Sequence, residues 1–229
     1  MTVVALTVAA CASDEPSTRP STPTTSSSAP TTTVPASTTT APPTFDGSVA
    51  PVDATRLTAS WRPGCPLGPE QLALLTVDHW GYDGVEHVGE LVVHADHAAA
   101  LLGVFQTLYD ARFPIERMEL VDVYGGDDYA STRANNTAGF NCRFAVGNPG
   151  SWSEHAFGQA IDVNPLVNPY VNDPRVGEPD QAPYLDRSLD APGMIRTDDV
   201  VVAAFESIGW HWGGFWSAPD YQHFSVSGH

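Results

Sequence analysis

Apolar residues in the middle of the chain follow two different periodicities. Residues 96–112 carry apolar side chains at helical spacing, which predicts a helix with Asp96 as its N-cap: Ala100, Leu101, Val104, Phe105 and Leu108. Residues 89–94 and 118–124 instead have the apolar content or the alternation that is typical of strands. Helix and strand signals therefore occur together in one region of the chain.

Shorter signals extend this pattern in both directions. We expect a helix-like run at residues 69–75, a loop at 127–147, strands at 159–163 and 222–226, and a helix from 198 or 199 to 208. The Pro- and Asn-rich residues 164–193 indicate a long surface excursion. Because helices and strands mix without strict alternation, the sequence predicts an α+β fold with a mainly antiparallel central sheet and flanking helices.

The N-terminal part of the chain has a different composition. Residues 16–44 consist almost wholly of Ser, Thr, Pro and Ala, which cannot bury enough apolar surface to offset the entropy of ordering. We therefore expect a disordered tether over residues 11–51, which its prolines stiffen and extend. The remaining residues 52–229 are expected to form one domain.

A short apolar run, residues 1–10, ends in small residues directly before Cys11. The run is too short to span a bilayer. The stretch Val8-Ala9-Ala10-Cys11 resembles a bacterial lipobox, although the positively charged region that usually precedes one is missing. The resemblance implies a signal peptide over residues 1–10, lipidation of Cys11 and a place on the extracytoplasmic face of the cell membrane. The alternative is a frayed terminus with a chance cysteine.

The charge of the chain excludes several classes of function. Its formal net charge is −17, so it gains no counterion release on a phosphate backbone, and we expect no nucleic acid partner. The same charge disfavours direct docking on anionic lipids, which leaves the lipid anchor as the expected contact with the membrane. All ten basic residues are Arg, so chemistries that need a lysine, such as the P-loop or the Schiff base, are excluded.

The sequence contains three cysteines. If Cys11 carries a lipid, Cys65 and Cys142 remain as an even pair in an oxidising compartment, and we predict a disulfide between them. Two buried free thiols are the alternative, because spacing alone does not fix the geometry.

Two motifs near the C-terminus carry the candidate chemistry. Ser153-x-His155-x-x-Gly158-x-Ala160-x-Asp162 is followed downstream by Asp220-x-x-His223. Together they resemble the D-alanyl-D-alanine carboxypeptidase family of zinc metallopeptidases, and within it the L-alanyl-D-glutamate endopeptidase subgroup. The resemblance extends over residues 61–225 and implies a Hedgehog/DD-peptidase-like fold and a peptidase domain over residues 52–229.

The metal ligands implied by these motifs are His155, Asp162 and His223. Side chains alternate along a strand, so Asp162 is aimed at one side while Ile161 and Val163 fill the other. Two imidazoles and one carboxylate are the protein ligands of a catalytic Zn2+ site, although other first-row divalent ions accept the same set. The alternative is that both histidines are ordinary polar surface residues.

Two further residues are candidates for catalysis. Asp220 lies three residues before His223, and we expect it to be the general base; an exposed loop aspartate is the alternative. The resemblance also implies an arginine that polarises the scissile carbonyl. We prefer Arg143 to Arg133, because residues 135–143 resemble the family's loop ahead of the metal motif. An arginine that merely pairs with a nearby acid is as compatible with the sequence.

Ser153 and Trp212 are candidate substrate-binding residues. Ser153 precedes a metal ligand by two residues and is equally compatible with a turn. Trp212 belongs to an aromatic segment before Asp220, and burial in the core is the alternative. The remaining histidines show no spacing that suggests a site: His79, His87, His94, His97, His211 and His229.

The resemblance implies zinc-dependent hydrolysis of an amide bond in the peptidoglycan stem peptide, of the D-Ala-D-Ala carboxypeptidase or the L-Ala-D-Glu endopeptidase type. Peptidoglycan peptides are thus the expected partner, and we expect a monomer. Two other hypotheses remain open: a catalytically silent zinc-binding lipoprotein that binds the cell wall, and a secreted adhesion or signalling lipoprotein.

Overall fold

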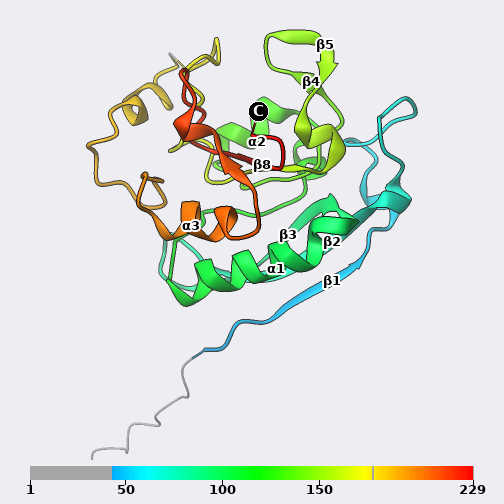
Figure 1. Ribbon diagram of the computed structural model, residues 1–229, viewed down its shortest axis with the longest axis horizontal. Helices are drawn as coiled ribbons and strands as arrows, with labels where there is room; N and C mark the ends of the chain where they lie inside the picture. The colour runs from blue at the N-terminus through cyan, green and yellow to red at the C-terminus, as the bar shows by residue number, and fades with distance from the viewer. Residues whose placement is uncertain (1–42, 177, 229) are drawn as a thin grey trace, which may run out of the picture. The chain divides into compact units, whose positions relative to one another are not determined.

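The computed structural model describes residues 43–176 and 178–228 (Figure 1). The predicted signal peptide and Cys11 lie outside these residues, as does most of the predicted tether. The folded unit begins at Pro43. Its first strand, β1 (Gly47–Pro51), lies within the segment assigned to the tether from its composition. It forms a strand because it pairs with residues 73–77, an apolar run further along the chain.

The first sheet has the order β1-β2-β3 and is antiparallel throughout. β2 (Leu72–Trp80) and β3 (Glu86–His94) pair over their whole length, from Leu72 opposite His94 to Trp80 opposite Glu86. The predicted strand at residues 89–94 is therefore confirmed and extended. The helix expected at residues 69–75 is wrong: only a 3₁₀ turn, η2 (Pro69–Gln71), precedes β2. The apolar run after the turn pairs between two strands, and this sheet pairing determines its structure.

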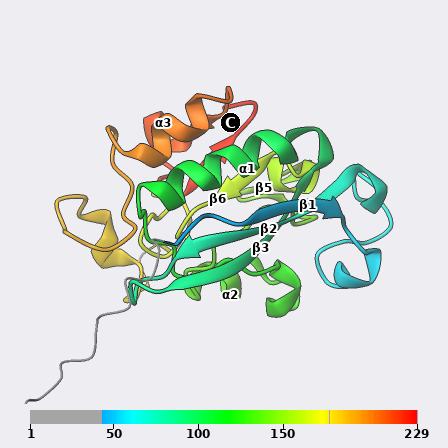
Figure 2. The same cartoon turned by 90° about the horizontal axis from the view of Figure 1, so that it is seen from below.

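The helix α1 (Ala95–Asp110) lies across this sheet (Figure 2). It buries the side chains whose helical spacing predicted it, with Leu101, Val104, Phe105 and Leu108 each at most 2% exposed. The predicted N-cap differs by two residues. His94 is the cap, and its Nδ1 accepts a hydrogen bond from the main-chain N–H of Asp96 at 3.2 Å. The residue chosen from the sequence therefore donates the capping hydrogen bond through its main chain.

A second antiparallel sheet has the order β6-β8-β7. It is built from short strands: β6 (Ala160–Asp162), β7 (His211–Trp212) and β8 (His223–Ser225). The helix α3 (Val200–Glu206), with Asp199 at its N-cap, packs beside α1 (Figure 2). Both this helix and the strands at the two motifs confirm the sequence prediction. The 3₁₀ helix η6 (Gly213–Phe215) follows β7.

The region between residues 118 and 152 departs most from the prediction. The strand expected at 118–124 is wrong, because residues 121–124 form the 3₁₀ helix η3 (Val121–Tyr124). Asp122 in this turn accepts hydrogen bonds from the main-chain N–H groups of Ala59 and Ser60, and Gly125 closes it in the left-handed conformation. The expected loop at 127–147 contains α2 (Asp128–Arg133) and the start of a hairpin, β4 (Phe144–Ala145) with β5 (Asn148–Trp152).

The described residues thus form a mixed fold of small antiparallel sheets and few helices, rather than one central sheet. The predicted disulfide between Cys65 and Cys142 is present, with the two Cα atoms 5.9 Å apart. None of the helices in the described ranges is long and apolar enough to cross a bilayer. Three further 3₁₀ helices complete the fold: η1 (Ala54–Arg56), η4 (Glu154–Phe157) and η5 (Ala182–Leu185).

Candidate metal centre

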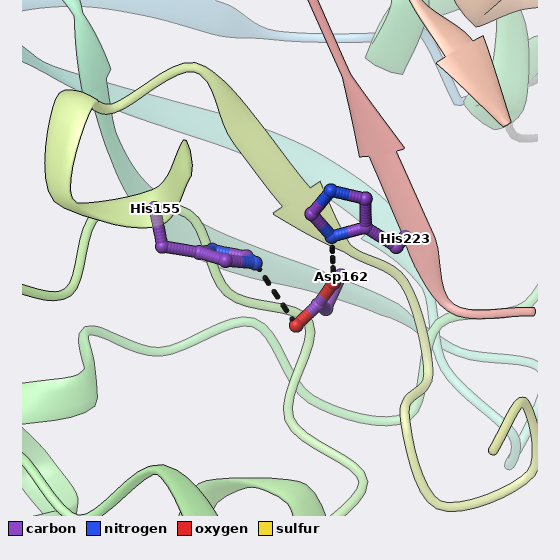
Figure 3. Close-up of side chains that lie close together, drawn as sticks. All are labelled: His155, Asp162 and His223. Atoms are coloured by element: carbon purple, nitrogen blue, oxygen red, sulfur yellow. Dashed lines mark hydrogen bonds and ion pairs between the residues drawn. The ribbon is translucent and has the colours of Figure 1, made fainter. Parts of the chain in front are cut away.

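Three side chains from the two sequence motifs meet at one point (Figure 3). Each of His155, Asp162 and His223 offers a ligand atom, and these atoms lie within 4.8 Å of one another. His155 Nε2 is 3.1 Å from Asp162 Oδ2, and His223 Nδ1 is 3.0 Å from Asp162 Oδ1. All three residues are less than 9% exposed. The carboxylate of Asp162 therefore lies between two buried imidazoles.

Strand pairing brings Asp162 and His223 together. The register of β6 and β8 places these two residues directly opposite each other. Because opposite residues in an antiparallel pair project to the same side, both side chains point to one face of the sheet. The alternation expected from the sequence is thus the arrangement that the strands adopt.

A turn that precedes β6 brings His155 to the same point. His155 lies in η4, where the Ser153 hydroxyl caps the turn by accepting from the main-chain N–H of His155 at 3.3 Å. Gly158 closes the turn with φ of 61°, a conformation that favours glycine. A Cβ atom at Gly158 would also lie 2.5 Å from the main-chain nitrogen of His94 in β3. Both the turn and its contact with the first sheet therefore require glycine.

One extended segment, residues 138–143, contacts Asp162 and the turn that carries His155. Ala138 exchanges two main-chain hydrogen bonds with Asp162, at 3.0 and 2.9 Å. The Gly139 carbonyl accepts from His155 Nδ1 at 2.7 Å, and the Arg143 carbonyl accepts from the main-chain N–H of Ser153 at 3.1 Å. The disulfide holds this segment at Cys142, so it connects the centre to the N-terminal part of the fold.

The side chains fit a divalent metal ion. Since Nδ1 of His155 donates to a carbonyl, its Nε2 carries the lone pair that a metal needs. That Nε2 is buried and makes no hydrogen bond, and it lies 3.1 Å from the carboxylate of Asp162. Two neutral imidazoles and a carboxylate match the donor set of catalytic zinc. These three residues are the only group of three or more acidic, His or Cys ligands that converge within the described part of the chain.

The electrostatics of the metal-free centre reflect the same arrangement. Burial raises the pKa of Asp162, but His155 and His223 outweigh it, so the pKa of Asp162 lies well below its usual value. Burial lowers the pKa of His155, but the adjacent Asp162 outweighs it and raises that pKa above 6.5. A buried carboxylate that remains charged needs a cation beside it, which a protonated histidine or a metal ion supplies.

A cavity of about 280 Å³ opens beside the three ligands. Asp220 lines it and is 8% exposed, and its Oδ1 is buried without a hydrogen-bond partner. Burial raises the pKa of Asp220 to about 8. This carboxyl group therefore shares a cavity with the ligands, and its burial makes it bind a proton more readily than an exposed aspartate does.

The structure distinguishes the two candidate arginines. Arg143 lines the cavity, and its Nε donates to Asp128 at 2.7 Å. Arg133 pairs instead with Asp180 and Glu178, and it does not line the cavity. The arginine preferred from the sequence is thus the one at the candidate site, although it is also paired with an acid.

The cavity wall includes one residue of the predicted aromatic segment and two residues that sequence reasoning did not name. Trp212 is buried in the core, where its indole donates to the carbonyl of Tyr221 at 2.8 Å, while Trp216 of the same aromatic segment lines the cavity. The long excursion predicted at residues 164–193 contributes Asp173 and Arg175. No periodicity marks these positions, because they lie in irregular chain.

Comparison with known proteins gives one match. Residues 146–226 match the family model described as D-alanyl-D-alanine carboxypeptidase. The comparisons with curated proteins and with solved structures give no match for this chain. The matched range contains both motifs and all three candidate ligands. The match therefore supports the D-alanyl-D-alanine carboxypeptidase family for this chain and, with it, a peptidase.

Proposed function

We propose that this chain is a zinc-dependent peptidase that hydrolyses an amide bond in the peptidoglycan stem peptide. One observation carries the proposal. His155, Asp162 and His223 converge at a cavity that a fourth group, the carboxyl of Asp220, also lines. A site that only binds zinc has no need of a buried carboxyl group with a raised pKa beside the ligands. The family match supports the substrate class, since the family is described by its action on a D-alanyl-D-alanine bond.

Zinc bound by these three residues would supply Lewis-acid activation of water and of the scissile carbonyl. The chain itself supplies the proton transfers. Asp220 accepts the proton of the attacking water and returns it to the leaving amine, so that the amine departs neutral. Arg143 lies on the cavity wall with its Nε held by Asp128. Its fixed positive charge stabilises the negative charge that develops on the carbonyl oxygen.

Residues of the excursion, of the aromatic segment and of the turn at His155 enclose the substrate. Ser153, Arg175 and Trp216 line the same cavity as the ligands. They reduce the access of water around the reacting atoms, which strengthens each electrostatic interaction there. The subgroup and the bond cut, D-Ala-D-Ala or L-Ala-D-Glu, follow from which peptide fits between these side chains.

We also propose that Cys11 is lipidated and that the Ser/Thr/Pro-rich tether holds the peptidase domain outside the membrane, within reach of the wall. The lipobox-like stretch Val8-Ala9-Ala10-Cys11 supports this part of the proposal. Mass spectrometry of the mature protein tests it. We expect an N-terminal Cys11 with an acyl modification, and a chain that begins unmodified at Met1 would contradict it.

The function is tested by incubating the zinc-loaded protein with defined stem peptides and with purified wall fragments, and by identifying the new termini by mass spectrometry. We expect one new amine and one new carboxylate at a single type of bond. The matched control is the His223→Ala variant, which lacks one ligand. Bound zinc at one equivalent with no new termini from any peptide would instead support the zinc-binding wall protein without catalytic activity.

A further inference from the structure

Buried polar atoms without a partner concentrate at the candidate site. Seven such side-chain atoms occur among the described residues, and four belong to residues that line the metal-centre cavity: His155 Nε2, Asp220 Oδ1, Gln222 Oε1 and His223 Nε2. An unpaired polar atom in a protein interior is costly, so each one calls for an explanation. Three of the four belong to the two ligand imidazoles and the proton carrier. Gln222 is neither a candidate ligand nor the proposed proton carrier.

The main chain fixes Gln222 at the cavity. Its carbonyl accepts from the main-chain N–H of Val163 at 2.9 Å, next to the ligand Asp162. It lies between Asp220 and His223 in sequence and lines the cavity with both. The main-chain contact with Val163 therefore fixes the backbone of Gln222 beside the strands that carry two of the ligands. Its side chain lines the cavity, and its Oε1 is buried there without a hydrogen-bond partner.

The neighbouring groups restrict what Gln222 can bind. A carboxylate or a carbonyl oxygen brings no hydrogen to an acceptor, and Asp162 and Asp220 make that part of the cavity rich in oxygen. An N–H group satisfies the unpaired Oε1 directly. A peptide carries both an N–H and a carbonyl, so it can donate to Gln222 while its carbonyl faces Arg143.

We propose that Gln222 is a substrate-binding residue whose Oε1 accepts a hydrogen bond from a main-chain N–H of the substrate, at an amide adjacent to the scissile bond. The inference rests on the proposed peptidase function. It makes the enzyme selective for peptides with an unsubstituted amide at that position over N-alkylated peptides and esters. A site that hydrogen-bonds a substrate N–H discriminates against analogues lacking it, because its own polar group then stays unpaired.

The test combines one substitution in the enzyme with one in the substrate. Gln222→Met keeps the length of the side chain and removes the acceptor, whereas Gln222→Glu keeps an acceptor. Each zinc-loaded protein is given a stem peptide and two versions in which the amide on either side of the scissile bond is N-methylated. Gln106→Met, on the exposed face of α1, is the matched control.

We expect Gln222→Met to lower kcat/KM on the unmodified peptide about tenfold, mainly through KM, with zinc content unchanged. One of the two N-methyl groups should lower the kcat/KM of the parent by a similar factor. It should lower the kcat/KM of Gln222→Met much less, because that variant already lacks the contact. Gln222→Glu should retain more of the discrimination than Gln222→Met. Gln106→Met should behave as the parent on all three peptides.

Binding is measured alongside turnover, by calorimetry with the zinc-loaded Asp220→Asn protein and the same peptides, with and without Gln222→Met. A parent that binds with this selectivity but cuts nothing would contradict the proposed function and leave the inference supported. Equal losses on N-methylation with and without Gln222 would overturn the inference while leaving the peptidase intact. Loss of zinc in Gln222→Met would also overturn it, since the residue would then position a ligand.

Discussion

Two groups of histidine and aspartate side chains in this fold have similar composition but different arrangements. At the metal centre, His155 and His223 face the single carboxylate of Asp162 from two sides. In the second group, His79 and His87 stack on each other with ring centres 5.7 Å apart. The Nε2 atom of His87 lies 3.1 Å from both oxygens of Asp83.

The second group lines a cavity of about 380 Å³, larger than the 280 Å³ beside the metal centre. The difference lies in burial and in where the ligand atoms point. The side chains of His87 and Asp83 are 45% and 56% exposed. The ligand atoms of His79, His87 and Asp83 do not form a converging set. Cavity volume and residue types therefore do not make a metal site. A shared buried carboxylate favours one, because its charge requires a cation beside it.

The largest contrast between the two groups is expected on removing their carboxylates. Asp162→Ala should abolish stoichiometric zinc binding and lower peptidase activity by more than about 10³-fold, because it removes a ligand and leaves two imidazoles without their common partner. Asp83→Ala should leave both zinc content and activity unchanged. Elemental analysis and peptide cleavage measure both. Zinc retained at one equivalent in Asp162→Ala would refute the assigned ligand set.

Sequence reasoning named the three residues that converge at the candidate metal centre but not all of the residues around them. His155, Asp162 and His223 were predictable because the two motifs that contain them resemble those of a zinc peptidase family, and such motifs are read directly from the sequence. Trp216 was among the aromatic residues considered for the wall of the groove, whereas Asp173 and Arg175 were not named, because an irregular segment brings them to the cavity through contacts distant in sequence. One such contact is the main-chain hydrogen bond from Val171 to the carbonyl of Pro219 at 3.0 Å.

The fold shows the same division between local and long-range causes. The helix α1 was predictable because one of its faces is apolar at a spacing that only a helix uses. Residues 118–124 alternate like a strand, yet the turn η3 forms there, where Asp122 accepts from two N–H groups of residues 59 and 60. The apolar run of β2 resembles a helix start until β1 and β3 pair with it. Pairing partners distant in sequence are not readable from one segment.

The next effect concerns proton transfer rather than metal binding. Asp220→Asn should lower kcat by about 10²- to 10⁴-fold with zinc content unchanged, because the amide cannot accept the proton of water. The matched substitution outside the metal centre is Asp83→Asn, which should have no effect on kcat. Single-turnover assays with zinc-loaded proteins measure the difference. Unchanged kcat in Asp220→Asn would mean that another group carries the proton.

The two candidate arginines, Arg143 and Arg133, provide another comparison. Arg143→Gln should lower kcat by about 10²-fold, as expected for one fixed group facing a developing oxyanion. Arg133→Gln, which removes exposed ion pairs with Asp180 and Glu178, should change kcat less than twofold. Steady-state kinetics on one peptide decide the matter. Equal effects from both variants would assign Arg143 to ion pairing alone.

The disulfide should affect stability more than chemistry. It closes a loop with a sequence separation of 77 and holds the segment beside Arg143. The Cys65→Ser/Cys142→Ser double variant should lose about 2–5 kcal/mol of stability in denaturant unfolding. Zinc affinity should fall only modestly, because the strand pairing of Asp162 with His223 remains. An undiminished unfolding free energy would show that packing alone holds the segment.

The smallest effect is expected at the second group, and it tests the comparison directly. His87→Gln removes the ring that stacks on His79 and pairs with Asp83, at a surface position where such pairs contribute little. Titration of the parent with zinc should therefore saturate at one tight equivalent, and His87→Gln should give the same curve. A second tight equivalent in the parent that disappears in His87→Gln would show that exposed, non-converging side chains can rearrange around a metal. Burial would then no longer distinguish the two groups.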